Sequence, residues 1–258
     1  MSNSSTLLNG KKVIVIGGSS GMGRAVAAAA LSNGASVVIA SSSQAKVEKA
    51  LELLKTGISN KDNVTATGQA LSITDFAALA KFLTKEAPFD HFVCTAGPAP
   101  QKMTSDFAPN ADIGEELKSN MDTRYWAMLN AANYIHKNNL IRPGGSFTMT
   151  AGVAQARPFA GWGFFVGALG AVETATRGLA VDLKPIRFNT ISPGLVNTEL
   201  MQEFDGGAGV AILEAHGKKL PVGHIGTPEE VAEAFIFAMK CQYLTGQVIL
   251  VDGGGILI

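Results

Sequence analysis

A glycine-rich turn near the N-terminus of this 258-residue sequence could bind phosphate groups. The turn reads GGSSGMG over residues 17–23, follows an apolar segment and precedes a segment of helical character. Glycine permits positive φ and lets an anion approach the backbone, and the following helix offers free N–H groups and the positive end of its dipole. A second apolar segment starts at Ser36, so the context predicts a dinucleotide site. The residues expected to hold the phosphates are Gly17, Ser19, Ser20, Gly21, Met22 and Gly23.

The end of the second apolar segment bears on which dinucleotide would bind. A site that prefers NAD places an acidic residue there to hold the ribose 2′-hydroxyl. This chain instead has Ser41, Ser42 and Ser43, whose hydroxyl and backbone N–H groups can donate to a 2′-phosphate, and Lys46 could add charge. The sequence therefore favours NADP(H). The serines could also cap a helix that begins near Gln44, and the two roles are compatible.

Short apolar segments that alternate with longer helical segments must position this site. We expect strands at residues 12–17, 36–41, 64–71, 89–94, 145–150, 186–194 and 246–254, and helices at 22–32, 44–55, 75–86, 112–138, 161–183 and 228–239. This order predicts an α/β fold, a single Rossmann-type doubly wound domain whose seven-stranded parallel sheet carries helices on both faces. No repeat divides the chain, so residues 1–258 are expected to form one domain, with a mobile lid at about 197–223.

Composition excludes several classes of function. The chain has 21 Lys plus Arg and 21 Asp plus Glu, so no net charge favours nucleic acid or an acidic membrane surface. No apolar run reaches the roughly 18 residues of a membrane span, and no signal peptide is evident, so a cytoplasmic protein is expected. Cys94 and Cys241 lack partner spacing, and we expect no disulfide framework and no metal site.

The glycine spacing and several later segments resemble those of the short-chain dehydrogenase/reductase family. Gly17, Gly21 and Gly23 match its T-G-x-x-x-G-x-G turn, although Ile16 stands at the threonine position. CTAG at residues 94–97 stands where the family has N-N-A-G, and SPGLVNTEL at 192–200 matches its P-G-x-x-x-T segment. GTPEEVA at 226–232 and LTGQVILVDGG at 244–254 match its C-terminal helix and last strand. The resemblance covers almost the whole chain.

The resemblance implies further cofactor contacts. Ser72 and Ile73 stand at the family's Asp-hydrophobe pair beside the adenine, and Val196 and Thr198 would meet the nicotinamide carboxamide. The other residues carried over from the CTAG and P-G segments are Thr95, Ala96, Gly97, Pro193 and Gly194.

The family's proton-transfer residues are missing from the expected positions. In the family a Tyr donates the proton, a Ser polarises the carbonyl, and a Lys lowers the pKa of the Tyr. Alignment places Phe165 at the Tyr, Leu169 at the Lys and Gly152 at the Ser. Asn120 alone matches the family's active-site asparagine. A Tyr-based mechanism in the usual geometry is therefore excluded by this alignment.

Two other side chains are candidates for the residual chemistry. Arg124 follows Asn120 by four residues, so on an α-helix both project from one face. Trp162 precedes Phe165 by three residues and is expected near the same pocket. A guanidinium and an indole N–H could polarise a carbonyl or stack on an aromatic substrate. A surface ion pair for Arg124 and core packing for Trp162 are the structural alternatives.

Several functions fit this pattern. The first is an atypical NADP(H)-dependent reductase of a bulky hydrophobic small molecule, in which an imine, iminium or activated carbonyl accepts hydride without a Tyr proton donor. The alternatives are an inert cofactor-binding sensor or partner subunit, and a cyclase or isomerase in which NADP is structural. The segment around Trp162 also resembles a divergent branch of microbial, especially fungal, biosynthetic reductases. The family resemblance implies a homodimer or homotetramer.

Overall fold

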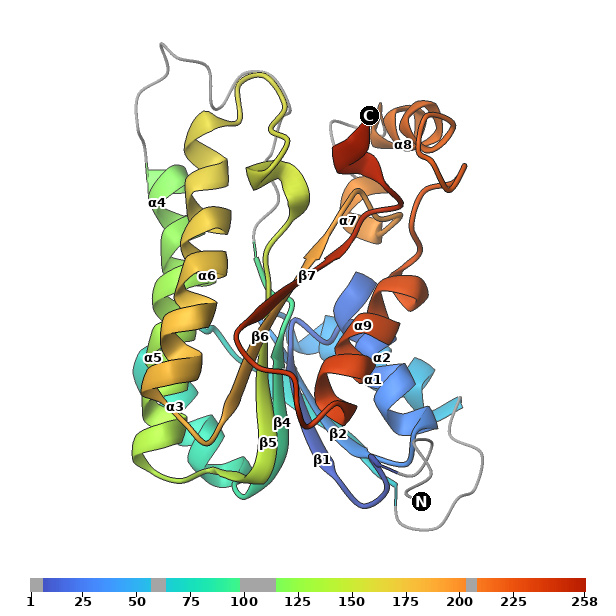
Figure 1. Cartoon of the computed structure of the whole chain (residues 1–258). Helices are drawn as coiled ribbons and strands as arrows, with labels where there is room; N and C mark the ends of the chain where they lie inside the picture. The colour runs from blue at the N-terminus through green and yellow to red at the C-terminus, as the bar shows by residue number, and fades with distance from the viewer. Residues whose placement is uncertain (1–6, 57–63, 98–114, 203–207) are drawn as a thin grey trace.

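The chain folds around one seven-stranded sheet, as the computed structural model in Figure 1 shows. The structure describes residues 7–56, 64–97, 115–202 and 208–258. The strand order is β3-β2-β1-β4-β5-β6-β7, and all six neighbouring pairs are parallel. The strands are β1 (Lys12–Ile16), β2 (Ser36–Ser41), β3 (Ala66–Ala70), β4 (Phe89–Cys94), β5 (Ile141–Thr150), β6 (Arg187–Pro193) and β7 (Gln247–Val251). The predicted fold class is confirmed.

Helices cover both faces of the sheet. They are α1 (Gly21–Ser32), α2 (Gln44–Thr56), α3 (Phe76–Glu86), α4 (Glu115–Met121), α5 (Ala127–Lys137), α6 (Gly163–Asp182), α7 (Glu199–Gln202), α8 (Ala208–Gly217) and α9 (Pro228–Lys240). Short helical turns occur at Val153–Gln155 and Gly255–Leu257. Among the described residues no helix combines the length and the apolar character that crossing a membrane requires.

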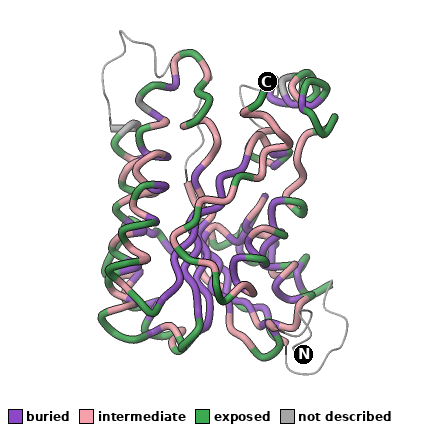
Figure 2. Tube along the Cα trace, in the orientation of Figure 1, coloured by how far each residue is buried: buried purple, intermediate pink, exposed green. Residues whose placement is uncertain are grey.

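The alternation of side chains along β1 explains the two layers. Val13 and Val15 point into the core under α1, α2 and α9, whereas Ile14 and Ile16 point into the core under α3, α5 and α6. Successive side chains of a strand face opposite sides, so a strand covered on both faces needs an unbroken apolar run. Figure 2 shows the sheet as a buried layer between half-exposed helices.

One predicted α-helix is interrupted in the structure. Residues 112–138 were expected to form a single α-helix, but α4 and α5 are separated by a π-helical segment at Asp122–Trp126, and residues 112–114 lie outside the described part. A π-helical turn holds extra residues, so side chains after it leave the phase of the preceding α-helix. The third strand begins at Ala66 rather than at residue 64, and the fifth begins earlier, at Ile141.

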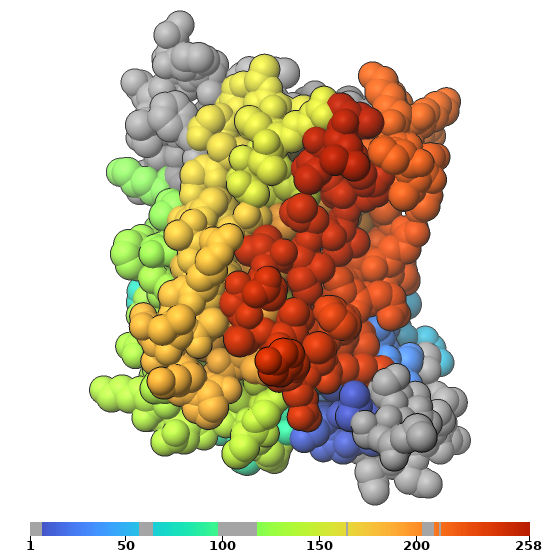
Figure 3. Space-filling view, in the orientation of Figure 1, coloured from blue at the N-terminus to red at the C-terminus, as the bar shows by residue number. Residues whose placement is uncertain are grey.

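The carboxyl ends of the strands meet at one edge of the sheet, and the switch in strand order lies between β1 and β4. In open parallel sheets ligands bind in the crevice at such a switch. Helices α7 and α8 and the C-terminus lie at this same end (Figure 1). Residues 203–207 of the predicted lid lie outside the described part, and the lid stays a prediction. Figure 3 shows β7 and the C-terminal segment on the surface beside α6.

Candidate active site

Two adjoining cavities open at the carboxyl edge of the sheet. The first, the cofactor cleft, has a volume of about 450 Å³, and the second, the large cavity, about 590 Å³. Five residues line both: Met22, Thr95, Gly97, Thr198 and Leu200. A molecule that fills the cofactor cleft can therefore reach the large cavity beside Gly97 and Thr198.

The cofactor cleft gathers most of the residues expected to bind the dinucleotide. Its lining includes Gly17, Ser19, Ser20, Gly21, Met22, Gly23, Ser41, Ser42, Ser72, Ile73, Thr95, Ala96, Gly97 and Thr198. Pro193, Gly194 and Val196 line the large cavity instead, next to the shared Thr198. The sequence did not single out Leu71, Ser119, Thr123, Glu199 and Leu200, which also line the cleft.

The phosphate loop needs its glycines because a Cβ at these positions would collide with backbone atoms. Gly17 has φ +82°, and a Cβ there would lie 2.7 Å from the backbone N of Ala96. A Cβ on Gly23 would lie 2.2 Å from the carbonyl oxygen of Gly17. Both neighbours are backbone atoms, which cannot swing aside. The loop is therefore packed against its own chain and the end of β4.

The N-terminus of α1 already binds an anionic group. The backbone N–H of Gly21 donates to Oε2 of Glu199 at 2.9 Å, and Arg24 pairs with Oε1 at 2.5 Å. Burial alone would raise the pKa of Glu199, but backbone hydrogen bonds and Arg24 outweigh it and lower that pKa. A carboxylate thus holds one of the positions that the pyrophosphate of a dinucleotide would take, and the loop fits such a group.

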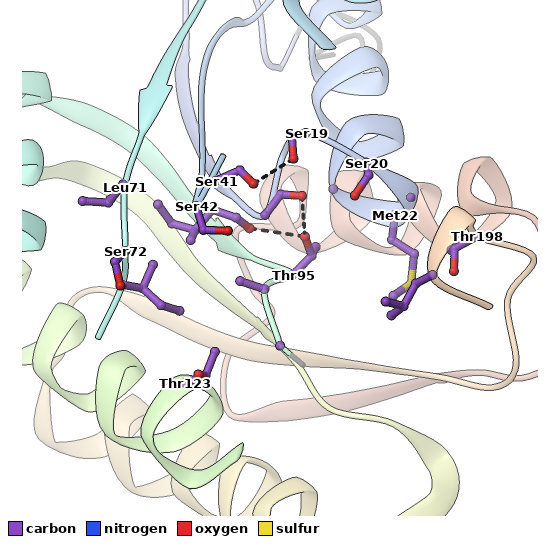
Figure 4. A pocket seen from close by; sticks show the side chains of 18 of the residues that line it. Ser19, Ser20, Met22, Ser41, Ser42, Leu71, Ser72, Thr95, Thr123 and Thr198 are labelled. Carbon is purple, nitrogen blue, oxygen red and sulfur yellow. Dashed lines mark hydrogen bonds between the residues drawn. The ribbon is translucent and has the colours of Figure 1, made fainter. Parts of the chain in front are cut away.

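The serines after β2 divide between two roles. Ser41 and Ser42 line the cleft, and Oγ of Ser19 donates to Oγ of Ser41 at 2.8 Å (Figure 4). Ser43 does not line it, and its Oγ accepts from the backbone N–H of Lys46 at 3.4 Å, at the start of α2. The position of Ser43 therefore supports its capping role. It does not support the prediction that Ser43 contacts the cofactor. Lys46 is exposed and also lies outside the lining.

Aromatic side chains form one wall of the large cavity. Ring centroids are 5.1 Å apart for Phe159 and Trp162, and 5.1 Å apart for Trp162 and Phe165. Trp162 is buried, and among the described residues none accepts a hydrogen bond from its Nε1. A bulky apolar ligand would find here an aromatic surface.

Arg124 lies where the two cavities meet. Its Cζ is 5.6 Å from the centroid of Phe165, a cation–π distance, and a Cβ on Gly97 would lie 2.4 Å from the same atom. Burial lowers the pKa of Arg124 to about 10, so the guanidinium still carries its charge at neutral pH. Gly97 leaves the space that the guanidinium occupies. The predicted place of Arg124 in the pocket agrees with the lining of the large cavity.

Asn120 is buried outside both cavities. It is 3% exposed and does not line them, whereas Arg124 lines the large cavity. A π-helical segment begins at Asp122, between the two residues. It turns Thr123 toward the cofactor cleft, across from Ser41 and Ser42 (Figure 4).

The three positions aligned with Ser, Tyr and Lys lie together in the large cavity. Gly152, Phe165 and Leu169 all line it, and a Cβ on Gly152 would be 3.5 Å from Cδ1 of Leu169. Phe165 and Leu169 are 5% and 2% exposed, so both are packed rather than hydrated. None of the three offers a proton donor at the site where the family resemblance expects one.

The cysteines and acidic groups offer little further chemistry in the described residues. Burial raises the pKa of Cys94 to about 12, so this thiol is not ionised at neutral pH. No group of three or more His, Cys, Asp or Glu side chains that could hold a metal ion occurs within the described ranges.

Comparisons with known proteins agree with the fold and with the expected cofactor. The profile of the family described as "Enoyl-(Acyl carrier protein) reductase" matches residues 16–255. The curated "Short-chain dehydrogenase/reductase malC" of Malbranchea aurantiaca is 35% identical, with 97% of this chain and 96% of that protein covered. "Short-chain dehydrogenase/reductase ucsE" of an Acremonium species is 33% identical, with 97% of each chain covered.

Two solved structures extend the comparison. The structure described as the MalC reductase/Diels-Alderase of Malbranchea aurantiaca superposes with a TM-score of 0.90 at 32% identity, with 99% of this chain and 100% of that chain covered. A small-chain dehydrogenase solved in complex with NADPH has a TM-score of 0.76 at 26% identity, with 97% and 100% covered. The likeness to fungal biosynthetic enzymes agrees with the branch resemblance of the sequence, and the NADPH complex supports the predicted cofactor.

Proposed function

Because the chain belongs to the short-chain dehydrogenase/reductase family, we propose that it is an atypical NADP(H)-dependent oxidoreductase. Its substrate is a bulky hydrophobic molecule, reduced at an imine, an iminium or an activated carbonyl without a Tyr proton donor. Support for NADP(H) comes from the serines at the end of β2 and from the family member solved with NADPH. When bound, NADP(H) supplies the hydride.

The observation that carries this proposal is the packing of Gly152, Phe165 and Leu169 in the large cavity. Reduction of a carbonyl creates an alkoxide, which needs an acid close by. An iminium carbon already carries positive charge, so hydride addition alone completes its reduction to an amine. The loss of all three proton-transfer groups is compatible with C=N reduction and with a substrate that brings its own acid.

Arg124 and Trp162 are the proposed polar groups of this reaction. The Arg124 guanidinium beside Gly97 would stabilise negative charge that develops on an activated carbonyl, or hold a polar group of the substrate. Trp162 contributes an aromatic surface to the large cavity, and its Nε1 is buried without a hydrogen-bond acceptor among the described residues. Asn120 stays a predicted site residue, although it is buried and lines neither cavity.

A second candidate function uses the same cavity. The relative with a TM-score of 0.90 is described as a reductase and a Diels-Alderase, so a cyclisation of the substrate in the large cavity is the alternative that a specific observation favours. A cyclase needs a cavity that folds a reactive molecule, and the apolar wall of Phe159, Trp162 and Phe165 meets that need. A cofactor-binding protein without chemistry remains the third outcome of the test below.

The test is turnover of NADPH with a panel of cyclic imines, iminium salts and ketones of matched size. We expect substrate-dependent loss of nicotinamide absorbance with the C=N compounds and little with simple ketones. Product analysis by mass spectrometry distinguishes reduction from cyclisation without reduction. NADPH binding with no turnover of any compound, and no new product, would contradict both functions and favour an inert sensor.

The expected homodimer or homotetramer also stays a proposal. Large apolar side chains are exposed on the outer helices, including Trp126 at 49% and Val181 at 70%. Because isolated exposed apolar residues are common, the assignment needs a direct mass measurement in solution. Sedimentation equilibrium over a range of protein concentrations provides it, and a monomer at all concentrations would contradict the proposal.

A further inference from the structure

The described charged side chains of the large cavity are mostly basic. Arg124, Arg157 and Lys219 line it together with His216, and Asp252 is the one acidic side chain among the described lining residues. Helix α8 ends beside His216, and Arg157 lies in the loop between β5 and α6. Segments far apart in the sequence thus bring cations to one cavity.

The carboxylate of Asp252 is held by backbone N–H groups and pairs with none of these cations. Asp252 Oδ1 accepts from the backbone N–H of Gly254 at 3.0 Å, and Oδ2 accepts from that of Ile256 at 2.9 Å. Both oxygens are therefore engaged in the C-terminal turn. Within the described part of the chain, Arg157 and Lys219 form no ion pair with an acidic side chain.

Arg157, His216 and Lys219 form one group, which we call the basic rim. All three line the same cavity. Burial lowers the pKa of His216, and the positive charges of Lys219 and then Arg157 lower it further, so both cations lie within electrostatic reach of His216. Arg157 and Lys219 are the two positive charges of the rim at neutral pH, and an anion placed between them relieves their repulsion. Arg157 and Lys219 are exposed and His216 is half-buried, so the rim is open to a ligand that enters from solvent.

The aromatic wall joins the basic rim to Arg124. The Phe159 ring is 6.4 Å from the His216 ring and 5.1 Å from the Trp162 ring, and Trp162 leads on to Phe165 beneath Arg124. Arg124 lies beside Gly97, which lines both cavities, whereas no member of the basic rim lines the cofactor cleft. A ligand that reaches from Gly97 along the wall would end at the rim.

We propose that the basic rim binds an anionic group of the substrate, a carboxylate or the enolate of an acidic enol, at the end of the molecule remote from the reacting carbon. The inference rests on the proposed function, because it names the substrate class of the same cavity. Arg157 contributes a planar fork that matches two oxygens, and Lys219 contributes a point charge. The substrate is thus amphipathic, with an apolar body on the aromatic wall and an acidic tail at the rim.

Two fluorescent probes of nearly equal shape test the rim without any turnover. The sulfonate probe 8-anilinonaphthalene-1-sulfonate carries one negative charge, and N-phenyl-1-naphthylamine carries none. Both are titrated into the full chain with saturating NADP⁺ present, so that the cofactor cleft is filled. Energy transfer from Trp162, compared with the Trp162→Phe variant, locates the bound probe in the large cavity.

The decisive variant is Arg157→Gln combined with Lys219→Gln. We expect the sulfonate probe to bind roughly fivefold to tenfold more weakly, because two exposed charges each contribute modestly, while the neutral probe is unaffected. The matched control is Lys137→Gln combined with Lys218→Gln, which removes the same charge from exposed residues outside the cavity lining and should leave both probes unchanged.

Three results would overturn the proposal. They are equal binding of the sulfonate probe to variant and parent, an equal weakening of both probes, and an effect as large in the control. Because the measurement is binding alone, its outcome does not depend on whether NADPH is consumed. Turnover can therefore fail while charge selectivity holds, and the two proposals are separated.

Discussion

The cofactor cleft and the large cavity adjoin but are built in different ways. The cleft is made of backbone, with glycines at Gly17, Gly21 and Gly23 that let the chain pack against itself and present N–H groups. The large cavity is made of side chains, in which an aromatic wall carries Arg124 at one end and the basic rim at the other. Cofactor binding should therefore respond to changes of backbone space, and substrate binding to changes of charge and shape.

The largest expected effect on cofactor binding comes from adding one methyl group to the phosphate loop. In Gly23→Ala the new Cβ would lie 2.2 Å from the backbone oxygen of Gly17, so the loop must shift. Overpacking of this kind typically costs about 1–3 kcal/mol, and we expect a lower Tm with loss of at least about tenfold in NADPH affinity. Gly167→Ala is the control, since a Cβ there meets no atom within 4 Å. Calorimetry and fluorescence titration measure both, and normal NADPH affinity in Gly23→Ala would contradict the packing argument.

Loss of the guanidinium should affect turnover and spare the cofactor. In Arg124→Ala we expect about 100-fold slower reduction of a substrate that the parent protein accepts, the effect of removing one preorganised donor, with nearly unchanged NADPH affinity. Arg124→Lys keeps a charge but loses the planar fork, so a large effect there indicates directed hydrogen bonds. Steady-state kinetics beside NADPH titration separates the two regions. Full activity in Arg124→Ala would return the residue to a structural role.

A substitution at Gly97 is a second way to displace the Arg124 guanidinium. In Gly97→Ala a Cβ would collide with the Arg124 guanidinium, and the flexible end of the side chain would be displaced rather than lost. We expect turnover to fall in the direction of Arg124→Ala, and the double variant to be no worse than the more impaired single variant. A double-mutant cycle on kcat/KM measures the coupling. Additive losses would show that Gly97 acts through the cofactor cleft alone.

The cofactor cleft, built of backbone, could be predicted from the sequence more fully than the large cavity, which is built of side chains. The phosphate loop lies within one strand–turn–helix unit, so GGSSGMG carries its own structural context. Trp162 was placed correctly because it and Phe165 lie at the start of one helix. The burial of Asn120 outside both cavities was not predicted, and nothing in the sequence signals the π-helical segment that follows it. The basic rim joins residues near 157 and 216, and no local pattern indicates that tertiary contact.

A smaller effect is expected at the 2′-phosphate end of the cofactor cleft. Ser42→Asp introduces a carboxylate into the lining, and repulsion should weaken NADPH by about tenfold while NADH changes little. Ser43→Asp is the control, because Ser43 lies outside the lining and caps α2. Titration of both cofactors with both variants measures the ratio. An equal shift in the two variants would mean that the charge acts as a diffuse field rather than at the site.

The last and smallest effect uses two carboxylates with opposite pKa shifts. Glu173 in α6 accepts from Oγ of Ser192 at 2.8 Å, and burial raises its pKa above the usual value of a Glu side chain, although hydrogen bonds from Ser192 and Gln155 and the charge of Arg177 oppose the rise. A raised folded-state pKa means that its contribution to stability is complete below the unfolded value and is lost as pH rises through the folded value. Glu173→Gln removes this titration and should gain Tm over the parent as pH rises from mildly acidic to neutral.

Glu199 has a lowered pKa, so the benefit from its charge is present above the unfolded value and fades as pH falls through the folded value. Glu199→Gln should therefore lose Tm relative to the parent at neutral pH and approach it in acid. Thermal unfolding of the three proteins over this pH range gives both slopes, and slopes of the same sign would contradict the assigned environments.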